Sequence, residues 1–191
     1  MEIISRQQFL ANKSCYFNKI LAGAVFIYPT DTIYGIGCDA TNAAAVRRIR
    51  EIKRRAQNPF SVAVPSKKWI ESNCSLSSGA RKWLKKLPGP YTLLLKLKSK
   101  SAVAASVHPK TEVLGIRMPG NWFSKIVAEL DIPIVSTSAN ITGKKHMTSM
   151  SDLNPQVAKK VDFIIYEGRK AARPSTIVKL DGKKISIIQR L

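Results

Sequence analysis

Cysteine is scarce in this sequence. Its three cysteines, Cys15, Cys38 and Cys74, are odd in number and widely spaced, and none belongs to a CxxC pair. A disulfide framework and a zinc site built on paired cysteines are therefore excluded, and the pattern indicates a reducing compartment. We expect the three side chains to be small buried hydrophobic groups without a redox role.

Long apolar runs are also missing. No stretch approaches the length needed to span a membrane. The first 30 residues carry charged and polar side chains throughout, which argues against a signal peptide. Together with the cysteine pattern, these absences predict a cytoplasmic protein that makes no membrane contact.

The common catalytic signatures are absent too. There is no GxxxxGK[ST] and no GxGxxG after a strand, so neither a P-loop nor a dinucleotide-binding fold is indicated. HExxH and GxSxG are missing, the two histidines lie in unremarkable segments, and no ligand cluster predicts a protein-bound metal. An enzyme with this sequence would have to work by positioning and electrostatic stabilisation through Lys, Arg, Ser, Thr and Asn. Those groups are sufficient for phosphoryl and nucleotidyl transfer.

Basic residues, by contrast, are abundant. The 32 Lys and Arg residues against 12 Asp and Glu give a formal net charge of +20. From Ser72 to Lys110 there is no acidic residue, yet the basic residues alternate with good core formers, so the charge lies on a folded body. This indicates a polyanionic partner, and we favour weak RNA binding without base readout.

The length and composition favour one compact unit. A chain of 191 residues with 45% hydrophobic residues can bury a sizeable core, and we expect a single domain over residues 1–191. Apolar runs and period-two patterns predict strands at residues 22–30, 60–66, 92–98, 113–119, 132–140, 162–168, 175–180 and 185–191. Helical spacing predicts helices near residues 42–53, 80–87 and 122–130. Strands outnumber helices and several are consecutive, so we expect an α/β fold with a twisted sheet of mixed parallel and antiparallel direction.

Two polar segments are expected to be irregular. Residues 30–41 are predicted to form a turn in which Gly35 and Gly37 permit unusual backbone angles. Residues 141–152 are predicted to form a mobile loop beside the strand at 132–140.

Polar groups gather where predicted strands end, which is where ligands of α/β sheets bind. They are Thr30–Thr32, Arg117 and Ser136–Asn140. Lys53 and Arg55, at the end of a predicted helix, could close the same cleft, because a lysine offers a point charge and an arginine a planar fork for successive phosphates. From the residues alone, such a basic run is about twice as often a solvated helix end as a phosphate clamp. Both interpretations stay open at this level.

Six segments, taken in order, resemble one known family. They are YPTDTIYGIGCDAT, the Lys-x-Arg of KRRAQNPF, PGPYTLLL, GIRMP, STSANITG and RPSTIV, and they run from about residue 20 to about residue 180. This combination resembles the YrdC-like family, and within it the short bacterial form of the threonylcarbamoyl-AMP synthases. One departure is Ala56, where the family usually has proline, and we expect a looser local turn there.

The resemblance implies a twisted sheet with helices around a deep basic concave cleft. It implies an enzyme that condenses L-threonine, bicarbonate or CO2, and ATP to L-threonylcarbamoyladenylate, with release of pyrophosphate. The threonine amine would first become a carbamate, whose carboxylate attacks the α-phosphate while Lys53, Arg55 and the Mg²⁺ carried by ATP offset the developing charge. A downstream transferase complex would pass the threonylcarbamoyl group to the adenosine beside the anticodon, so tRNA would be a weak partner, either directly or through that complex.

The same resemblance implies roles for individual residues. The signature tetrad, which would hold the triphosphate and act in catalysis, is Lys53, Arg55, Ser138 and Asn140. Two further nucleotide contacts would be Asn58 and Ser175. The threonine contacts would be Thr32, Arg117 and Ser136, with the arginine pairing bidentately with the substrate carboxylate.

Two other functions are alternatives to this synthase. A noncatalytic RNA-binding or ribosome-maturation factor would use the basic cavity for the RNA backbone, and a steep salt dependence of RNA binding without ATP turnover would support it. A carbamoyl-adenylate former of the hydrogenase-maturation type shares this domain. It is disfavoured because its acylphosphatase-like segment and its cysteine-rich zinc fingers are not visible in the sequence.

Overall fold

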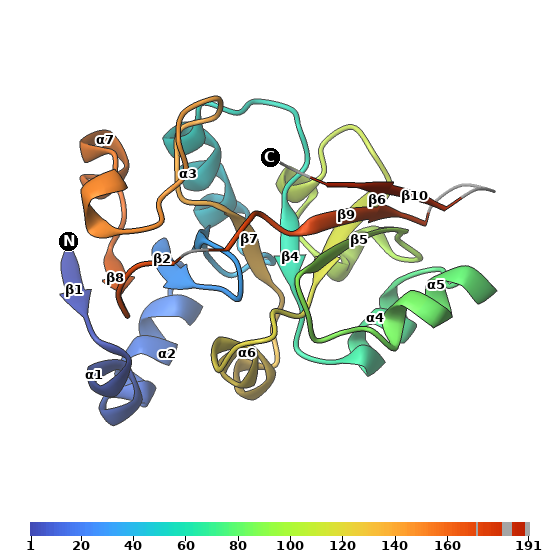
Figure 1. Ribbon diagram of the computed structural model, residues 1–191, viewed down its shortest axis with the longest axis horizontal. Coiled ribbons are helices and arrows are strands. Elements are labelled where there is room, and N and C mark those ends of the chain that lie inside the picture. Colours follow the sequence, from blue (N-terminus) through green and yellow to red (C-terminus); the bar gives the residue numbers. More distant parts are fainter. Residues whose placement is uncertain (171, 181–184, 190–191) are drawn as a thin grey trace.

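The computed structural model describes residues 1–170, 172–180 and 185–189. Figure 1 shows its elements, which in chain order are β1 (Glu2–Ile4), α1 (Arg6–Ala11), α2 (Lys13–Leu21), β2 (Phe26–Pro29), β3 (Tyr34–Gly37), α3 (Ala43–Lys53), β4 (Ser61–Ala63), α4 (Lys67–Asn73), α5 (Ser78–Leu84), β5 (Tyr91–Lys96), η1 (Lys100–Ala102), η2 (Ala105–Val107), β6 (Val113–Arg117), α6 (Phe123–Leu130), β7 (Ile134–Ser138), η3 (Met150–Asp152), α7 (Pro155–Ala158), β8 (Phe163–Ile165), β9 (Thr176–Lys179) and β10 (Ser186–Ile188). Within the described residues, ten strands and seven α-helices confirm the predicted α/β class.

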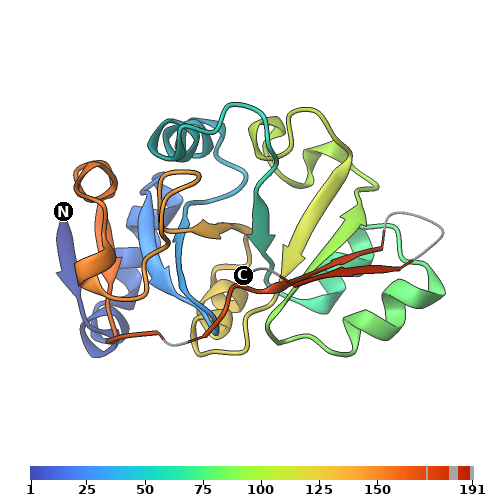
Figure 2. The same ribbon diagram turned by 45° about the horizontal axis from the view of Figure 1, so that its top comes forward.

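The strands form one mixed sheet. Their order is β1-β8-β2-β3-β7-β4-β6-β5-β9-β10. β8 pairs in parallel with β1 and β2, β4 with β6 and β5 with β9, and the remaining neighbours are antiparallel. β7 stands near the middle, between β3 and β4, and Figure 2 shows helices above and below these central strands. The prediction of a sheet with mixed direction is confirmed.

Both faces of the central strands are buried, and successive side chains alternate between two cores. One core takes Ile27, Val62, Val135 and Ile164 from the strands, and Val46, Ile49 and Ile52 from α3. The other core takes Phe26, Tyr28, Ile134 and Phe163 from the same strands, and Phe123, Ile126 and Val127 from α6. This alternation follows from the period of two along a strand, and it places α3 and α6 on opposite faces of the sheet.

The start and end of α3 are both well defined. The side chain of Asn42 accepts a hydrogen bond from the amide of Ala45 at 3.0 Å and so caps the N-terminus of the helix. At the other end, Arg54 adopts the left-handed conformation (φ 49°, ψ 46°). Because this residue turns the chain out of the helix, Lys53 stays buried against the sheet while Arg55 enters the next loop. The prediction that the basic run lies at a helix end is confirmed.

The predicted turn at residues 30–41 is wrong in its middle. Tyr34–Gly37 forms strand β3, which pairs with β2 and β7, and neither glycine adopts a positive φ. Glycine is needed at position 37 for a different reason. A Cβ there would lie 2.6 Å from the carbonyl oxygen of Val135 and 2.8 Å from the ring of Tyr28. The constraint is close packing of β3 against β7 and an aromatic ring.

Three other expectations meet mixed outcomes. Cys38 and Cys74 are buried, but Cys15 on α2 is exposed, so the expectation of three buried cysteines is wrong for that one. The final predicted strand is present as β10, while its last two positions, 190–191, lie outside the described residues. Residues 141–152 are irregular apart from the short 3-10 helix η3. No helix among the described residues is long and apolar enough to cross a membrane.

Replacement of Gly37 by alanine tests the packing constraint. The added methyl meets a backbone carbonyl that cannot shift without disturbing the β3–β7 pairing, so we expect Gly37→Ala to lower the free energy of unfolding by about 1–3 kcal/mol. Urea denaturation measures the change. Gly120→Ala is the matched control, because a Cβ at that position finds its nearest neighbour at 3.5 Å, an ordinary contact. Equal stability of the two variants would contradict the assignment.

Candidate active site

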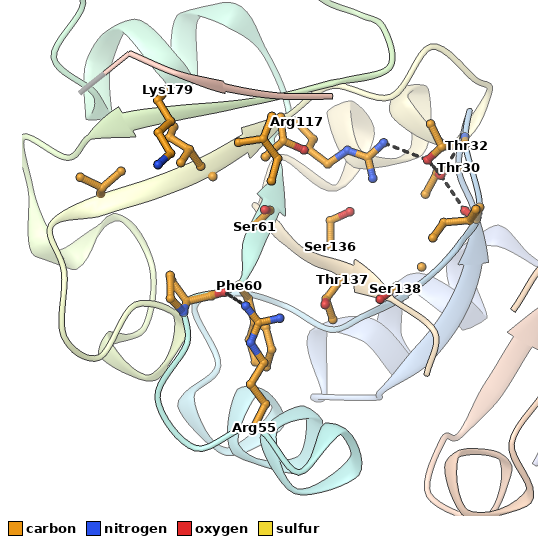
Figure 3. Close-up of a pocket in the computed structure, with 18 of the residues that line it drawn as sticks. Thr30, Thr32, Arg55, Phe60, Ser61, Arg117, Ser136, Thr137, Ser138 and Lys179 are labelled. Carbon is orange, nitrogen blue, oxygen red and sulfur yellow. Dashed lines mark hydrogen bonds between the residues drawn. The ribbon is translucent and has the colours of Figure 1, made fainter. Parts of the chain in front are cut away.

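A cavity of about 510 Å³ opens over the centre of the sheet, and Figure 3 shows the side chains around it. Its wall is formed by residues from β3, β4, β5, β6, β7 and β9 and from the loops before β3 and β4. Three cationic side chains, Arg55, Arg117 and Lys179, line it, and no carboxylate is among its described lining residues. Hydroxyl groups from several strands fill much of the remaining wall. This composition suits an anionic ligand that also offers hydrogen-bonding groups.

Arg117 ends strand β6 at one side of this cavity, and it is buried. Its Nη2 donates to Asp31 Oδ1 at 3.0 Å and to Thr32 Oγ1 at 3.4 Å. Asp31 Oδ2 in turn accepts from the amide of Gly120 at 2.8 Å. The carboxylate therefore fixes the direction of the guanidinium, and the charge of the arginine is paired within the fold.

Two polar atoms beside this ion pair are buried and lack a partner among the described residues. They are Nε of Arg117 and Oγ of Ser136. Both residues line the cavity, and Figure 3 shows their side chains with Thr30 and Thr32 around the same space. A buried donor or hydroxyl without a partner is costly, so this end of the cavity is built to receive polar atoms of a ligand.

Thr30 and Thr32 play different parts in this wall. The hydroxyl of Thr30 donates to the carbonyl oxygen of Ile33 at 2.6 Å and accepts from the amide of Thr32 at 3.1 Å. It therefore shapes the turn before β3. The hydroxyl oxygens of Thr32 and Thr30 are 2.9 Å apart, and the Thr32 hydroxyl also accepts a hydrogen bond from Arg117.

Arg55 approaches the cavity from the other side, as Figure 3 shows. Its Nε donates to the carbonyl oxygen of Asn58 at 3.2 Å and its Nη2 to that of Pro59 at 2.7 Å. The guanidinium carbon lies 5.3 Å from the ring centre of Phe60. In the described hydrogen bonds of this side chain Nη1 takes no part, so both of its N–H groups remain for a ligand. Burial lowers the pKa of the guanidinium.

Lys53 lies behind the cavity wall and does not line it. Its Nζ donates to the carbonyl oxygen of Ser138 at 2.6 Å, and at 2.9 Å to both the carbonyl oxygen and Oδ1 of Asn140. Ser138 Oγ donates to the same Asn140 Oδ1 at 2.6 Å. Three of the four residues of the predicted tetrad thus form one connected group, with the Ser138 hydroxyl on the cavity side. Burial, followed by the nearby charge of Arg55, lowers the pKa of Lys53 to about 7.

The two other predicted nucleotide contacts lie outside the cavity lining. Asn58 is exposed, and its carbonyl oxygen accepts from both Arg55 and Arg50. Ser175 is buried, with its Oγ 2.8 Å from Oγ1 of Thr92, a residue that does line the cavity.

Sequence reasoning missed two residues that shape the site. They are Arg50, which holds the loop of Arg55, and Lys179, which supplies a third cation. Neither gave a local signal, because their place depends on how the elements pack. Asp31, which orients Arg117, lies within the predicted polar segment Thr30–Thr32 but was given no role of its own. No group of three or more His, Cys, Asp or Glu residues that could hold a metal occurs in the described ranges.

Comparison with known proteins identifies relatives of this architecture. A threonylcarbamoyl-AMP synthase of Xanthomonas axonopodis pv. citri is 30% identical over 159 residues, covering 75% of this chain and 79% of the relative. A Methanocaldococcus jannaschii protein, provisionally named a threonylcarbamoyl-AMP synthase, is 41% identical over 175 residues, covering 90% and 81%. The crystal structure of P. abyssi Sua5 complexed with L-threonine matches with a TM-score of 0.83 and 28% identity.

The P. abyssi match covers 97% of this chain, which spans 56% of the Sua5 chain. A family model named for Sua5, YciO and YrdC, and described as telomere recombination, matches residues 18–190. The resemblance inferred from the six sequence segments is therefore confirmed at the level of the family. The chain belongs to the Sua5/YciO/YrdC family.

Proposed function

We propose that this chain is a threonylcarbamoyl-AMP synthase, which forms L-threonylcarbamoyladenylate and pyrophosphate from L-threonine, bicarbonate or CO2, and ATP for threonylcarbamoyladenosine modification of tRNA. The observation that carries the proposal is that the two ends of one cavity offer different groups to a ligand. One end has unpartnered buried atoms of Arg117 and Ser136, and the other has the free guanidinium edge of Arg55. Relatives that carry this activity in their names support it.

L-Threonine would occupy the end beside Arg117. A carboxylate placed there would accept from Nε of Arg117, whose guanidinium is already aimed by Asp31. Ser136 and Thr32 would offer hydroxyls to the substrate amine or side-chain hydroxyl. The Sua5 structure with bound L-threonine supports an amino-acid site in this fold. A half-enclosed pocket of this kind suits a small polar substrate.

The triphosphate would lie toward Arg55 and Ser138. Arg55 would contact phosphate oxygens through Nη1, and the Ser138 hydroxyl would face the same group from β7. Lys53 and Asn140 would act from behind this surface, because the lysine ammonium is already engaged by three oxygen atoms. Asn58 and Ser175 would contribute indirectly, Asn58 through its bond to Arg55 and the buried Ser175 through its contact with Thr92.

Carbamate formation and adenylation would both take place between these ends. The unprotonated threonine nitrogen adds to CO2 with loss of a proton, or to bicarbonate with loss of water. An oxygen of the resulting carbamate then bonds to the α-phosphorus of ATP as the bond to pyrophosphate breaks. Arg55 would stabilise the charge that shifts onto the departing pyrophosphate. The described lining holds no carboxylate that could bind a metal, so Mg²⁺ would enter with ATP, ligated by phosphate oxygens and water, and would neutralise phosphate charge.

The formal charge of +20 supports a further contact with tRNA, either directly or through the transferase complex that uses the product. ATP and tRNA are available in the cytoplasm, and we propose that compartment for the reaction.

Threonine-dependent release of pyrophosphate from ATP tests the proposal. With Mg²⁺ and bicarbonate present, we expect release only when L-threonine is added, and we expect Arg55→Gln to lower kcat/KM by roughly 100-fold because a pre-positioned charge is lost. Arg54→Gln is the matched control, since this exposed neighbour donates to Gln156 and not to the cavity. Steep salt-dependent RNA binding without any turnover would favour a noncatalytic RNA-binding factor instead.

Arg117→Lys tests the amino-acid end separately. A lysine cannot reproduce the planar fork held by Asp31, so the KM for L-threonine should rise roughly tenfold or more while the KM for ATP changes little. Arg48→Lys is the control, because it alters another Arg–Asp pair, with Asp162, outside the cavity. A rise in the KM for ATP alone would contradict the assignment of this end to threonine.

The buried ammonium of Lys53 predicts a pH dependence of stability. Its pKa is about 7 in the folded protein, whereas an unfolded lysine has a pKa of about 10.4. Between these values the unfolded chain binds more protons, so this group makes the fold relatively more stable as pH rises from 7 toward 10. We expect the urea midpoint of the native protein, measured against that of Lys53→Met, to increase over this window. A difference that stays constant or falls would contradict it.

A further inference from the structure

Arg50 is a partly buried arginine of α3 that the proposed reaction does not use. All three nitrogens of its guanidinium donate to backbone carbonyl oxygens. Nε donates to Ser106 at 2.6 Å and Nη2 to Val107 at 3.3 Å. Nη1 is shared among three acceptors in the loop after the helix, at 2.8 Å to Arg55, 3.0 Å to Ala56 and 3.3 Å to Asn58.

These bonds join the loop that follows α3 to the segment that contains η2. Residues 54–60 carry Arg55 to the cavity, and residues 105–107 form the short turn η2. A second link runs between the same loops, from the amide of Phe60 to the carbonyl oxygen of Val107 at 2.9 Å. The sequence led us to expect a looser turn at Ala56. The carbonyl oxygen of this residue accepts a hydrogen bond from Arg50 of α3, which holds the turn in place.

The position of Arg55 depends directly on these contacts. The carbonyl oxygen of Asn58 accepts from both arginines, at 3.3 Å from Nη1 of Arg50 and at 3.2 Å from Nε of Arg55. Both guanidinium groups also pack on the ring of Phe60, at 4.6 Å and 5.3 Å from its centre. Of the two carbonyl groups that aim the Arg55 side chain, Arg50 therefore holds that of Asn58 directly, while that of Pro59 follows in the same loop.

We propose that Arg50 is a positioning residue, which holds the 54–60 loop so that the guanidinium of Arg55 faces the phosphate end of the cavity. This role rests on the proposed function for its effect on ATP, but the ordering of the loop can be measured without it. Only a planar group with five N–H donors can reach carbonyls in two loops at once. A lysine at this position offers a single charged centre and cannot replace it.

Steady-state kinetics and hydrogen exchange of Arg50→Gln and Arg50→Lys test the proposal, with Arg47→Gln as matched control. Arg47 is an exposed arginine of the same helix, so the control makes the same charge change without touching the loop. We expect both Arg50 variants to raise the KM for ATP roughly tenfold and to lower kcat as well, because a displaced Arg55 stabilises the departing pyrophosphate less, while the KM for L-threonine changes less than about threefold. Peptides covering residues 54–60 should exchange faster in both variants, and the control should match the native protein.

A rescue variant separates positioning from general stability. In the described backbone hydrogen bonds, the amide of Ala56 is not a donor, so proline at this position breaks none of them and restricts the loop by fixing φ. We expect Arg50→Gln combined with Ala56→Pro to recover slow exchange and at least part of the lost ATP affinity. Ala56→Pro alone is measured beside it.

The outcomes separate this proposal from the proposed function. Loop exchange and ATP constants that match those of Arg47→Gln would overturn the role of Arg50. Faster exchange across the whole protein, with equal losses for both substrates, would overturn it as well, because that result indicates a merely structural residue. If the native protein shows no threonine-dependent turnover, the proposed function fails, while the exchange of residues 54–60 still decides whether Arg50 orders the loop.

Discussion

The hydrogen bonds of one buried ammonium group connect helix α3 to the end of the central strand β7. Lys53 ends helix α3, and its three acceptor oxygens belong to Ser138 and Asn140 at the end of β7. These segments are more than 80 residues apart in the chain, and without this contact the carbonyl oxygen of Asn140 would lose the donor that the structure gives it. Burying an ammonium is costly, and saturation by oxygen acceptors is what makes the burial possible here. The lysine thus fixes the relation of α3 to the central strand.

The remaining cations around the cavity differ in how far their charge is compensated by their partners. Arg117 is buried and paired with a carboxylate, so its charge is largely compensated before any ligand arrives. Arg55 is bound to neutral carbonyl groups, and Lys179 lies at the edge on β9. A neutral partner keeps the full positive charge available to a ligand, whereas a carboxylate partner mainly fixes direction. The cavity therefore has a directional end and a strongly charged end, as an amino acid and a triphosphate require.

The sequence predicted those parts of the fold that depend on local pattern. The strands around 92–98 and 132–140 follow from alternation, and α3 follows from the spacing of Val46, Ile49 and Ile52. The N-terminal elements β1, α1 and α2, and helix α4, were not predicted, because their short apolar patterns are interrupted by polar residues. Strand order was also out of reach, since the neighbours β7 and β4 are far apart in the chain and meet only through tertiary packing.

The same distinction between local pattern and tertiary packing applies to the site residues. Arg55, Arg117, Ser136 and Ser138 were predicted and do line one cavity, because each stands at the end of a recognisable element. Lys53 and Asn140 were also predicted, but the position of the lysine behind the wall could not be, since burial at a helix end is decided by the conformation of Arg54. Gly37 shows the same limit: conformational freedom was the local explanation, and the actual one is a carbonyl oxygen of another strand. Local sequence identifies which groups are available, and packing decides which of them reach the ligand.

The described lining residues of the cavity include no general base, and the proposed adenylation does not need one. In the proposed reaction the nucleophile is a carbamate oxygen that is already anionic, so the chemical demand falls on alignment and on charge leaving with pyrophosphate. Alignment needs rigid directions, which paired Arg117 and saturated Lys53 supply. Charge stabilisation needs an uncompensated cation, and in the proposed function that cation is Arg55, which stands in a loop. A loop is the least rigid place for that cation, and it is here that the structure adds the carbonyl contacts of Arg50.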